Sequence, residues 1–283
     1  MRTRVGRTRV VLAATRFGHP RLMAFERLRR RNPVVRALAA PARWWLRRGS
    51  LRVGAGPAAG LRLSLEYIPV AHAHAGLMAS GWLEHEVQEA MRRHLGAGGV
   101  VYDVGANVGF FSMLGARLVG PAGRVYAIEP VPHNAAAVRA NAALNGFANV
   151  AVLERAAGPA SGREELLVVE DLSWSHLASC GDHPQAEHAV EVDVVALDEL
   201  VASGELDPPT LVKIDVEGSE ADVLSGLRET LVQHRPVVVC ELHDTNAEVA
   251  DALDELGYET RSLEGPEAVR DAPPNVHVIA LPR

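Results

Sequence analysis

An apolar segment followed by two closely spaced glycines is the feature that most constrains how this chain folds. Residues 100–104 are mostly apolar, Gly105 and Gly109 flank the turn after them, and residues 107–119 carry apolar side chains at helical spacing up to Gly120. This pattern predicts a buried strand, a tight turn and a helix. The first N–H groups of such a helix lack partners within the helix and point into the turn. We therefore expect the turn to bind a nucleotide-like cofactor.

Strands and helices alternate along most of the chain. Further strands are expected at 124–129, 150–154, 210–215, 236–242, 258–262 and 275–281. Pro132 is expected to begin a helix that Gly146 ends, and capping-box patterns at Ser219 and Thr245 are expected to open two more. Apolar strands joined by helices favour an α/β fold, with a parallel sheet covered on both faces.

The rest of the chain is predicted to form an N-terminal region and an insertion. Residues 1–50 hold 14 arginines and one acid, and we interpret them as a basic extension. Residues 51–98 are predicted to form a cap region of short strands and a helix near 82–95, and residues 99–283 a cofactor-binding domain. Within that domain, residues 160–195 are predicted to be a β-rich insertion around a polar loop that contains Trp174.

The basic extension raises the question of an anionic partner. We disfavour nucleic acid, because the aromatic residues among the arginines follow no pattern that suggests a base-stacking surface, and we leave open a weak contact with a membrane surface. The two cysteines, Cys180 and Cys240, lie far apart without zinc-site spacing, which favours reduced thiols. No apolar run reaches the roughly 18 residues of a membrane span. A soluble, cytoplasmic protein is expected.

Acidic residues end several of the predicted strands, where ligands bind in open parallel sheets. Glu129 lies 26 residues after Asp103, near the spacing at which an acid hydrogen-bonds the ribose hydroxyls of an adenosine cofactor. A dinucleotide site requires a third glycine for the pyrophosphate, and Phe110 stands in its place. The acid at Asp103 suits the cationic S-adenosylmethionine better, so an NAD-dependent oxidoreductase is a distant alternative.

Four motifs in order make the interpretation specific. They are Asp103-Val-Gly-Ala-Asn-Val-Gly109, Tyr126-Ala-Ile-Glu129-Pro130, Leu211-Val-Lys213-Ile-Asp215-Val-Glu217-Gly-Ser-Glu220 and Val239-Cys-Glu241-Leu-His243. Over residues 80–283 the chain resembles the FkbM family of S-adenosylmethionine-dependent O-methyltransferases.

The resemblance implies a class I methyltransferase fold, with a mostly parallel seven-stranded sheet, helices on both faces and an antiparallel last strand. It also implies cofactor contacts from Asp103, Gly105, Asn107 and Glu129. The predicted cofactor site further includes three residues of the same motifs, Gly109, Pro130 and Asp215.

Methyl transfer to a hydroxyl requires a group that accepts its proton. His243 is the predicted base, because its ordinary pKa lies near neutrality. Asp215, Glu241 and Lys213 complete the catalytic candidates, with Glu217 and Asp244 close in sequence. Asp215 and Glu241 offer oxygen ligands to a cation such as Mg²⁺. We do not favour a metal, because no convincing third ligand accompanies them.

The predicted function is an S-adenosylmethionine-dependent O-methyltransferase that acts on a hydroxyl of a small molecule, sugar or secondary metabolite. Two alternatives remain open. One is a cofactor-binding module without chemistry of its own. The other is a methyltransferase that reaches nucleic acid or a membrane surface through residues 1–50.

Overall fold

The computed structural model describes residues 49–68, 73–169, 176–177, 186–266, 268–273 and 275–283. The chain divides into two compact units, Met1–His85 and Glu86–Arg283. Nearly all of the basic extension, the loop around Trp174 and Cys180 lie outside the described residues. The boundaries predicted at residues 50 and 98 stay predictions.

The first unit contains a short hairpin and a helix. Strands β1 (Ser50–Arg52) and β2 (Arg62–Ser64) pair antiparallel, with Leu51 opposite Leu63 and both side chains buried. Helix α4 (Ala73–Ser80) follows. The sequence analysis did not predict this helix, because its alanines and Gly76 form no clear apolar stripe.

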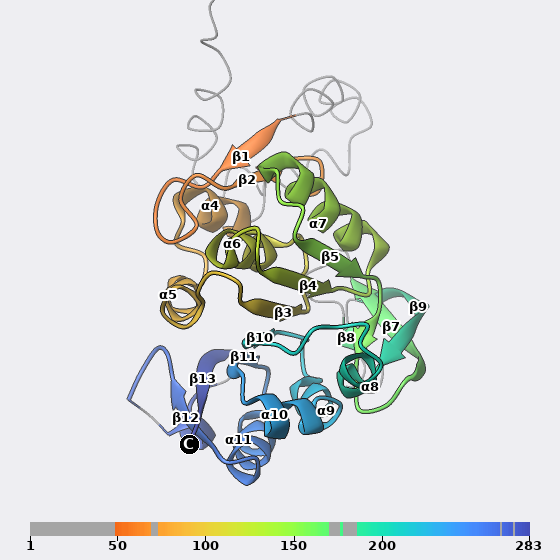
Figure 1. The fold of residues 1–283 in the computed structure, drawn as a ribbon. Helices are drawn as coiled ribbons and strands as arrows, with labels where there is room; N and C mark the ends of the chain where they lie inside the picture. Colours follow the sequence, from red (N-terminus) through yellow and green to blue (C-terminus); the bar gives the residue numbers. More distant parts are fainter. Residues whose placement is uncertain (1–48, 69–72, 170–175, 178–185, 267, 274) are drawn as a thin grey trace, which may run out of the picture. The chain divides into compact units, whose positions relative to one another are not determined.

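A seven-stranded sheet forms the centre of the second unit (Figure 1). Its strands are β3 (Val100–Val104), β4 (Arg124–Ile128), β5 (Val150–Leu153), β10 (Leu211–Ile214), β11 (Val237–Leu242), β12 (Tyr258–Ser262) and β13 (Val276–Pro282). They lie in the order β12-β13-β11-β10-β3-β4-β5. The last strand, β13, pairs antiparallel with both β11 and β12, and the other described pairs of this sheet are parallel. The predicted class I methyltransferase fold is confirmed.

Helices cover the sheet. They are α5 (His85–His94), α6 (Phe110–Val119), α7 (Pro132–Asn145), α8 (Leu197–Ala202), α9 (Glu220–Ser225), α10 (Arg228–His234) and α11 (Asn246–Glu255), with the 3₁₀ turn η3 (Val269–Asp271). In Figure 1, α6 and α7 accompany β3–β5, and α9–α11 accompany β10–β12. As predicted, Pro132 begins α7 and Gly146, at φ 74°, ends it.

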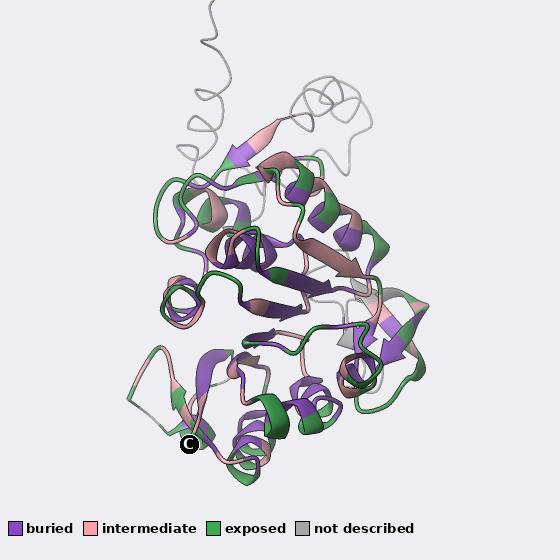
Figure 2. Cartoon of the chain, in the orientation of Figure 1, coloured by how far each residue is buried: buried purple, intermediate pink, exposed green. Residues whose placement is uncertain are grey.

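The two faces of the sheet are buried against different helices, and few strand residues are exposed (Figure 2). On one face, Tyr102 and Val212 join a large apolar cluster with side chains of α9, α10 and α11. On the other face, Asp103 and Lys213 point toward α6. The alternation of side chains along a strand therefore separates the apolar core from two buried charges.

The helix predicted after Ser219 is interrupted, which corrects the expectation of one continuous helix. It divides into α9 and α10 at Gly226, whose backbone packs so tightly that an added Cβ would lie 2.0 Å from the Gly158 carbonyl oxygen. Among the residues that the structure describes, neither the Ser219 nor the Thr245 hydroxyl caps its own helix. The capping function predicted for these two side chains was wrong.

The β-rich segment near 160–195 forms a separate sheet. Its strands β6 (Ala156–Ala157), β7 (Gly162–Val169), β8 (His176–Leu177) and β9 (Ala186–Val195) lie in the order β6-β9-β7-β8. Leu166 of β7 and Leu177 of β8 are opposite each other and buried. In the described part of the chain, no helix is long and apolar enough to cross a bilayer.

Candidate functional site

A pocket lies at the carboxyl ends of β3, β4 and β10, where the predicted cofactor residues meet. Gly105, Asn107, Glu129, Pro130 and Asp215 line it. Further lining comes from Val104, Ile128, Val131, Ala156, Ala157, Leu166, Leu177, Val216, Glu217 and Ser219. The pocket thus combines apolar walls with three carboxylates.

Two glycines shape the turn between β3 and α6. Gly105 has φ 77°, and an added Cβ would lie 1.7 Å from the Asp215 carbonyl oxygen, so only glycine fits there. Gly109 has φ 82° and lies at the N-cap of α6, against Val138. Between them, Asn107 has φ 51° and accepts the Val108 N–H with its side-chain oxygen at 2.7 Å. This turn places backbone and side-chain groups at the pocket.

Glu129 is a buried carboxylate that the backbone of the same turn holds in place. Its two oxygens accept N–H groups of Asn107 at 2.7 Å and Val131 at 2.8 Å, and the carboxylate is 4% exposed. Burial raises the pKa of Glu129 to about 7, although these hydrogen bonds oppose the shift. A carboxylate accepts about four hydrogen bonds, so this group has acceptor capacity left for a ligand.

Asp103 lies in β3, before the turn, and is not among the residues that line the pocket. Its side chain is fully buried, one oxygen accepts the Ser112 hydroxyl at 2.5 Å, and the other lies 3.9 Å from the Lys213 ammonium. Burial raises the pKa of Asp103, and the charge of Lys213 opposes the rise. The roles predicted for Asp103 and Gly109 as cofactor contacts stay predictions, since neither is among the residues that line the pocket.

Lys213, the only lysine of the chain, is buried between strand-end acids. Its ammonium donates to Asp215 at 2.9 Å and lies 4.9 Å from the centre of the Phe111 ring. Burial raises the pKa of Asp215, but Lys213, His243 and His277 together outweigh it, so the net shift is downward. Lys213 therefore helps to keep Asp215 ionised at the pocket.

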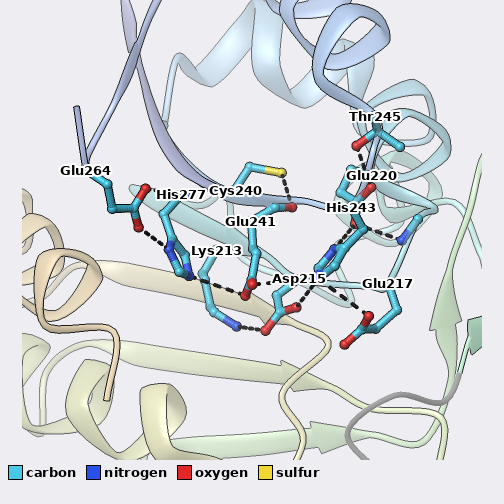
Figure 3. Close-up of polar contacts among 11 residues, drawn as sticks. Lys213, Asp215, Glu217, Glu220, Cys240, Glu241, His243, Thr245, Glu264 and His277 are labelled. Carbon is cyan, nitrogen blue, oxygen red and sulfur yellow. Dashed lines mark hydrogen bonds and ion pairs between the residues drawn. The ribbon is translucent and has the colours of Figure 1, made fainter. Parts of the chain in front are cut away.

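Four carboxylates surround His243 (Figure 3). Its Nδ1 lies 2.8 Å from a Glu220 oxygen, and its Nε2 lies 3.5 Å from Glu217, 3.7 Å from Glu241 and 4.0 Å from Asp215. We call these five residues the His243 cluster. They come from the loop after β10, from α9 and from β11 and the residue after it.

Burial and charge within the His243 cluster shift two pKa values. Burial by itself lowers the pKa of His243, but the hydrogen bond to Glu220 and the charges of Glu217 and Asp215 raise it to about 9. Burial raises the pKa of Glu217 to about 7, with His243 opposing. At neutral pH the imidazole is therefore protonated in the cofactor-free protein, and the predicted base must lose this proton before it accepts another.

Asp215, Glu241 and His243 also form a group in which one ligand atom from each lies within 4.8 Å of the others. Positive charge is already present here, because Lys213 donates to Asp215 and His243 is protonated. Ion pairs account for the arrangement, so we assign no metal to it.

A second histidine extends these contacts. His277 of β13 lies opposite Glu241 in the strand register, with its Nε2 3.3 Å from that carboxylate. Its Nδ1 lies 2.5 Å from Glu264, whose pKa is lowered because the contacts with His277 outweigh burial. Glu241 thus lies between His243 and His277.

The structure brings the predicted catalytic residues together and adds others. Lys213, Asp215, Glu241 and His243 lie within one network of contacts, although their roles stay predictions. Sequence reasoning missed Glu220, whose place at the first turn of α9 is also typical of an acid that stabilises a helix. It also missed Leu166 and Leu177, because an apolar strand residue gives no sign of which pocket it lines.

Comparison with known proteins identifies the family. The FkbM methyltransferase domain matches residues 103–260. The 31-O-demethyl-FK506 methyltransferase FkbM of Streptomyces tacrolimicus is 32% identical over 213 residues, which cover 65% of this chain and 82% of that protein. The chain belongs to the FkbM methyltransferase family. The predicted resemblance is confirmed, and the chain is a methyltransferase.

Two other similar proteins match over a smaller share of their own length. The hexuronic acid methyltransferase AglP of Haloferax volcanii is 32% identical over 147 residues, 51% of this chain and 56% of that protein. Among solved structures, the methyltransferase FkbM of Methylobacillus flagellatus is 18% identical with a TM-score of 0.44, over 88% of this chain and 60% of that one.

Proposed function

We propose that this FkbM-family methyltransferase uses S-adenosylmethionine to methylate a hydroxyl of a small molecule, sugar or secondary metabolite. Family membership supports methyl transfer, and the names of two relatives support an oxygen acceptor on a small molecule or sugar, since one methylates 31-O-demethyl-FK506 and the other hexuronic acid. The observation that carries the proposal is the pocket around Glu129, because its chemistry matches the cofactor.

The pocket fits S-adenosylmethionine in charge and polarity. Asp215 and Glu217 on its wall suit a ligand that bears a sulfonium and an ammonium, and Ile128, Val131 and Leu166 suit a flat apolar base. The buried Glu129 is suited to accept ribose hydroxyls. When bound, the cofactor supplies the electrophilic methyl group and a thioether leaving group.

The remaining task of the protein is to align the acceptor and take its proton. We assign that proton to His243 Nε2, which faces three carboxylates. Asp215 and Glu241 hold the imidazole from the other sides, and Lys213 helps to keep Asp215 ionised. A cation held beside Asp215 would lower the pKa of His243 and so favour its neutral form.

The oxidoreductase alternative is less well supported. Phe110 occupies the position at which a dinucleotide site needs a third glycine. Its ring is buried, and the centres of the Phe110 and Phe111 rings lie 5.2 Å apart. A small-molecule acceptor, a cytoplasmic location and the absence of a required divalent cation remain parts of this proposal.

The first test is calorimetric titration with S-adenosylhomocysteine and, separately, NAD. We expect binding of S-adenosylhomocysteine alone, and Glu129→Gln should weaken it about tenfold, because a carboxylate that accepts ribose hydroxyls is replaced by a neutral amide. Glu154→Gln, an exposed acid after β5 paired with Arg139, is the matched control and should bind as the parent does.

Transfer of a labelled methyl group to a panel of polyols, sugars and hydroxylated metabolites then tests the acceptor class. Tight binding of NAD would support the oxidoreductase. Cofactor binding without any methylated product would favour the non-catalytic module. Product formed only with RNA or vesicles would favour a methyltransferase that reaches nucleic acid or a membrane surface through residues 1–50.

A further inference from the structure

Glu220 is a buried carboxylate to which the proposed function assigns no role. It lies at the first position of α9 and is fully buried, whereas the side chain of its neighbour His243 is 15% exposed. Figure 3 shows the contact between the two side chains. One of its oxygens lies 2.8 Å from His243 Nδ1, and the other accepts the Thr245 hydroxyl at 2.7 Å. The carboxylate therefore joins the histidine to the protein interior.

Besides His243, two further groups hold this carboxylate in place. The Gly218 N–H donates to the same oxygen that contacts His243, at 2.9 Å. Glu217 and Gly218 both have positive φ, 54° and 108°, and this turn directs the Gly218 N–H back to Glu220. Thr245 occupies the N-cap of α11 but gives its hydroxyl to Glu220, which explains why it does not cap its own helix.

This geometry selects one form of the imidazole. A buried carboxylate accepts hydrogen bonds, so His243 Nδ1 carries the proton that lies between the two residues. The neutral ring then has its lone pair on Nε2. That atom faces the carboxylates of Asp215, Glu217 and Glu241, on the side where Asp215 and Glu217 line the pocket.

We propose that Glu220, held by Thr245 and the Gly218 N–H, is a positioning residue that fixes the orientation and tautomer of His243 for methyl transfer. The inference rests on the proposed function. The proton of the acceptor hydroxyl passes to Nε2 as the acceptor oxygen bonds to the methyl carbon. The carbon–sulfur bond breaks, and its electron pair stays on sulfur. Glu220 keeps the resulting imidazolium bound through Nδ1 without touching the reacting atoms.

The first experiment measures the histidine directly, by long-range ¹H–¹⁵N NMR of the full chain labelled at histidine, with S-adenosylhomocysteine as the probe ligand. His243→Gln assigns the signal. We expect the neutral ring to carry its proton on Nδ1. Glu220→Gln keeps the shape but removes a negative charge, so the pKa of His243 should fall. Unchanged tautomer and pKa in that variant would overturn the proposal.

The second experiment measures methyl transfer against pH, with the acceptor found by the screen. His243 faces Asp215 and Glu217 from the loop after β10, Glu220 from α9 and Glu241 from β11. With the other three acids intact, Glu220→Gln should move the acidic limb of kcat/KM to lower pH. It should also lower kcat about tenfold while KM changes little, because a misplaced base slows the proton transfer.

Three further variants separate positioning from folding. Asp222→Asn removes an exposed acid of the same helix and should leave kcat and the pH profile unchanged. Thr245→Ser keeps the hydroxyl and should retain activity, whereas Thr245→Val should lower kcat in the same direction as Glu220→Gln. If Glu220→Gln shifts the NMR signals but changes neither kcat nor the pH limb, Glu220 holds the ring without serving catalysis, and the proposal is wrong.

Failure of the proposed function has a different signature. If the parent protein transfers no methyl group to any acceptor, the general reaction is at fault, and the NMR comparison of the parent with Glu220→Gln still decides whether Glu220 sets the state of His243.

Discussion

Two regions at the carboxyl ends of the strands present buried acids to the site, but they stabilise these acids differently. We call the region at the ends of β3 and β4 the first edge, and the region at the ends of β10 and β11 the second edge. Glu129 is held by backbone N–H groups of Asn107 and Val131. The His243 cluster is held by side-chain charges from separate elements. The first edge depends on backbone geometry and the second on charge balance.

This difference predicts different responses to mutation and pH. A backbone-held acid fails when the turn can no longer adopt its conformation. A charge-balanced cluster fails when one partner is removed, because the charges left behind are buried without compensation.

Gly105→Ala should have the largest effect, and it tests the first edge. Its Cβ would lie 1.7 Å from a backbone oxygen that cannot swing away, so we expect a loss of more than about 4 kcal/mol in the free energy of unfolding. Denaturant unfolding measures this loss. Gly146→Ala is the control: φ is 74°, and no described atom lies within 4 Å of the added Cβ. It should lose about 1–2 kcal/mol, and equal losses would contradict the argument.

Lys213→Met tests the second edge. It keeps the length of the apolar stem but leaves Asp103 and Asp215 without their ammonium, so we expect a loss of about 3–5 kcal/mol in the free energy of unfolding. The loss should shrink at acidic pH, where the carboxyls are protonated. Arg139→Met breaks the exposed pair with Glu154 and should lose less than about 1 kcal/mol. A loss from Lys213→Met no larger than this would argue against a charge-balanced edge.

The pH dependence of stability separates His243 from Glu129, because the two groups titrate in different pH windows. The folded-state pKa of His243, about 9, lies above its ordinary 6.5. Its contribution, on the order of 3 kcal/mol, is therefore fully present below pH 6.5 and is lost as the pH rises through 9. The pKa of Glu129 is raised from 4.5 to about 7, so its contribution to the free energy of unfolding is lost as the pH rises between those two values.

Unfolding free energies measured from pH 5 to 10 check this separation. His243→Gln should abolish the decline between pH 6.5 and 9, and Glu129→Gln should leave that part of the curve as it is. A parental curve that stays flat between pH 6.5 and 9 would show that the carboxylates around His243 do not raise its pKa.

Sequence reasoning recovered the first edge better than the second. The turn at Gly105 and the acid at Glu129 are specified by residues close together in the chain, so a local pattern predicts them. Thr245 was predicted to cap a helix and Glu220 was not singled out, because the local sequence gives no sign of the contact between these two residues. The single helix predicted after Ser219 failed for the same reason, since the close approach of Gly158 to Gly226 comes from distant sequence.

The sequence by itself determined the alternating strands and helices, the cofactor turn, the family and the set of acids at the strand ends, because periodicity and short motifs encode these locally. Only the tertiary structure decided which acids face water and which are buried, that Lys213 compensates Asp103 and Asp215, and that Glu220 lies against His243. These relations arise where separate strands and loops meet, and their energies depend on distances and burial that no stretch of sequence specifies alone.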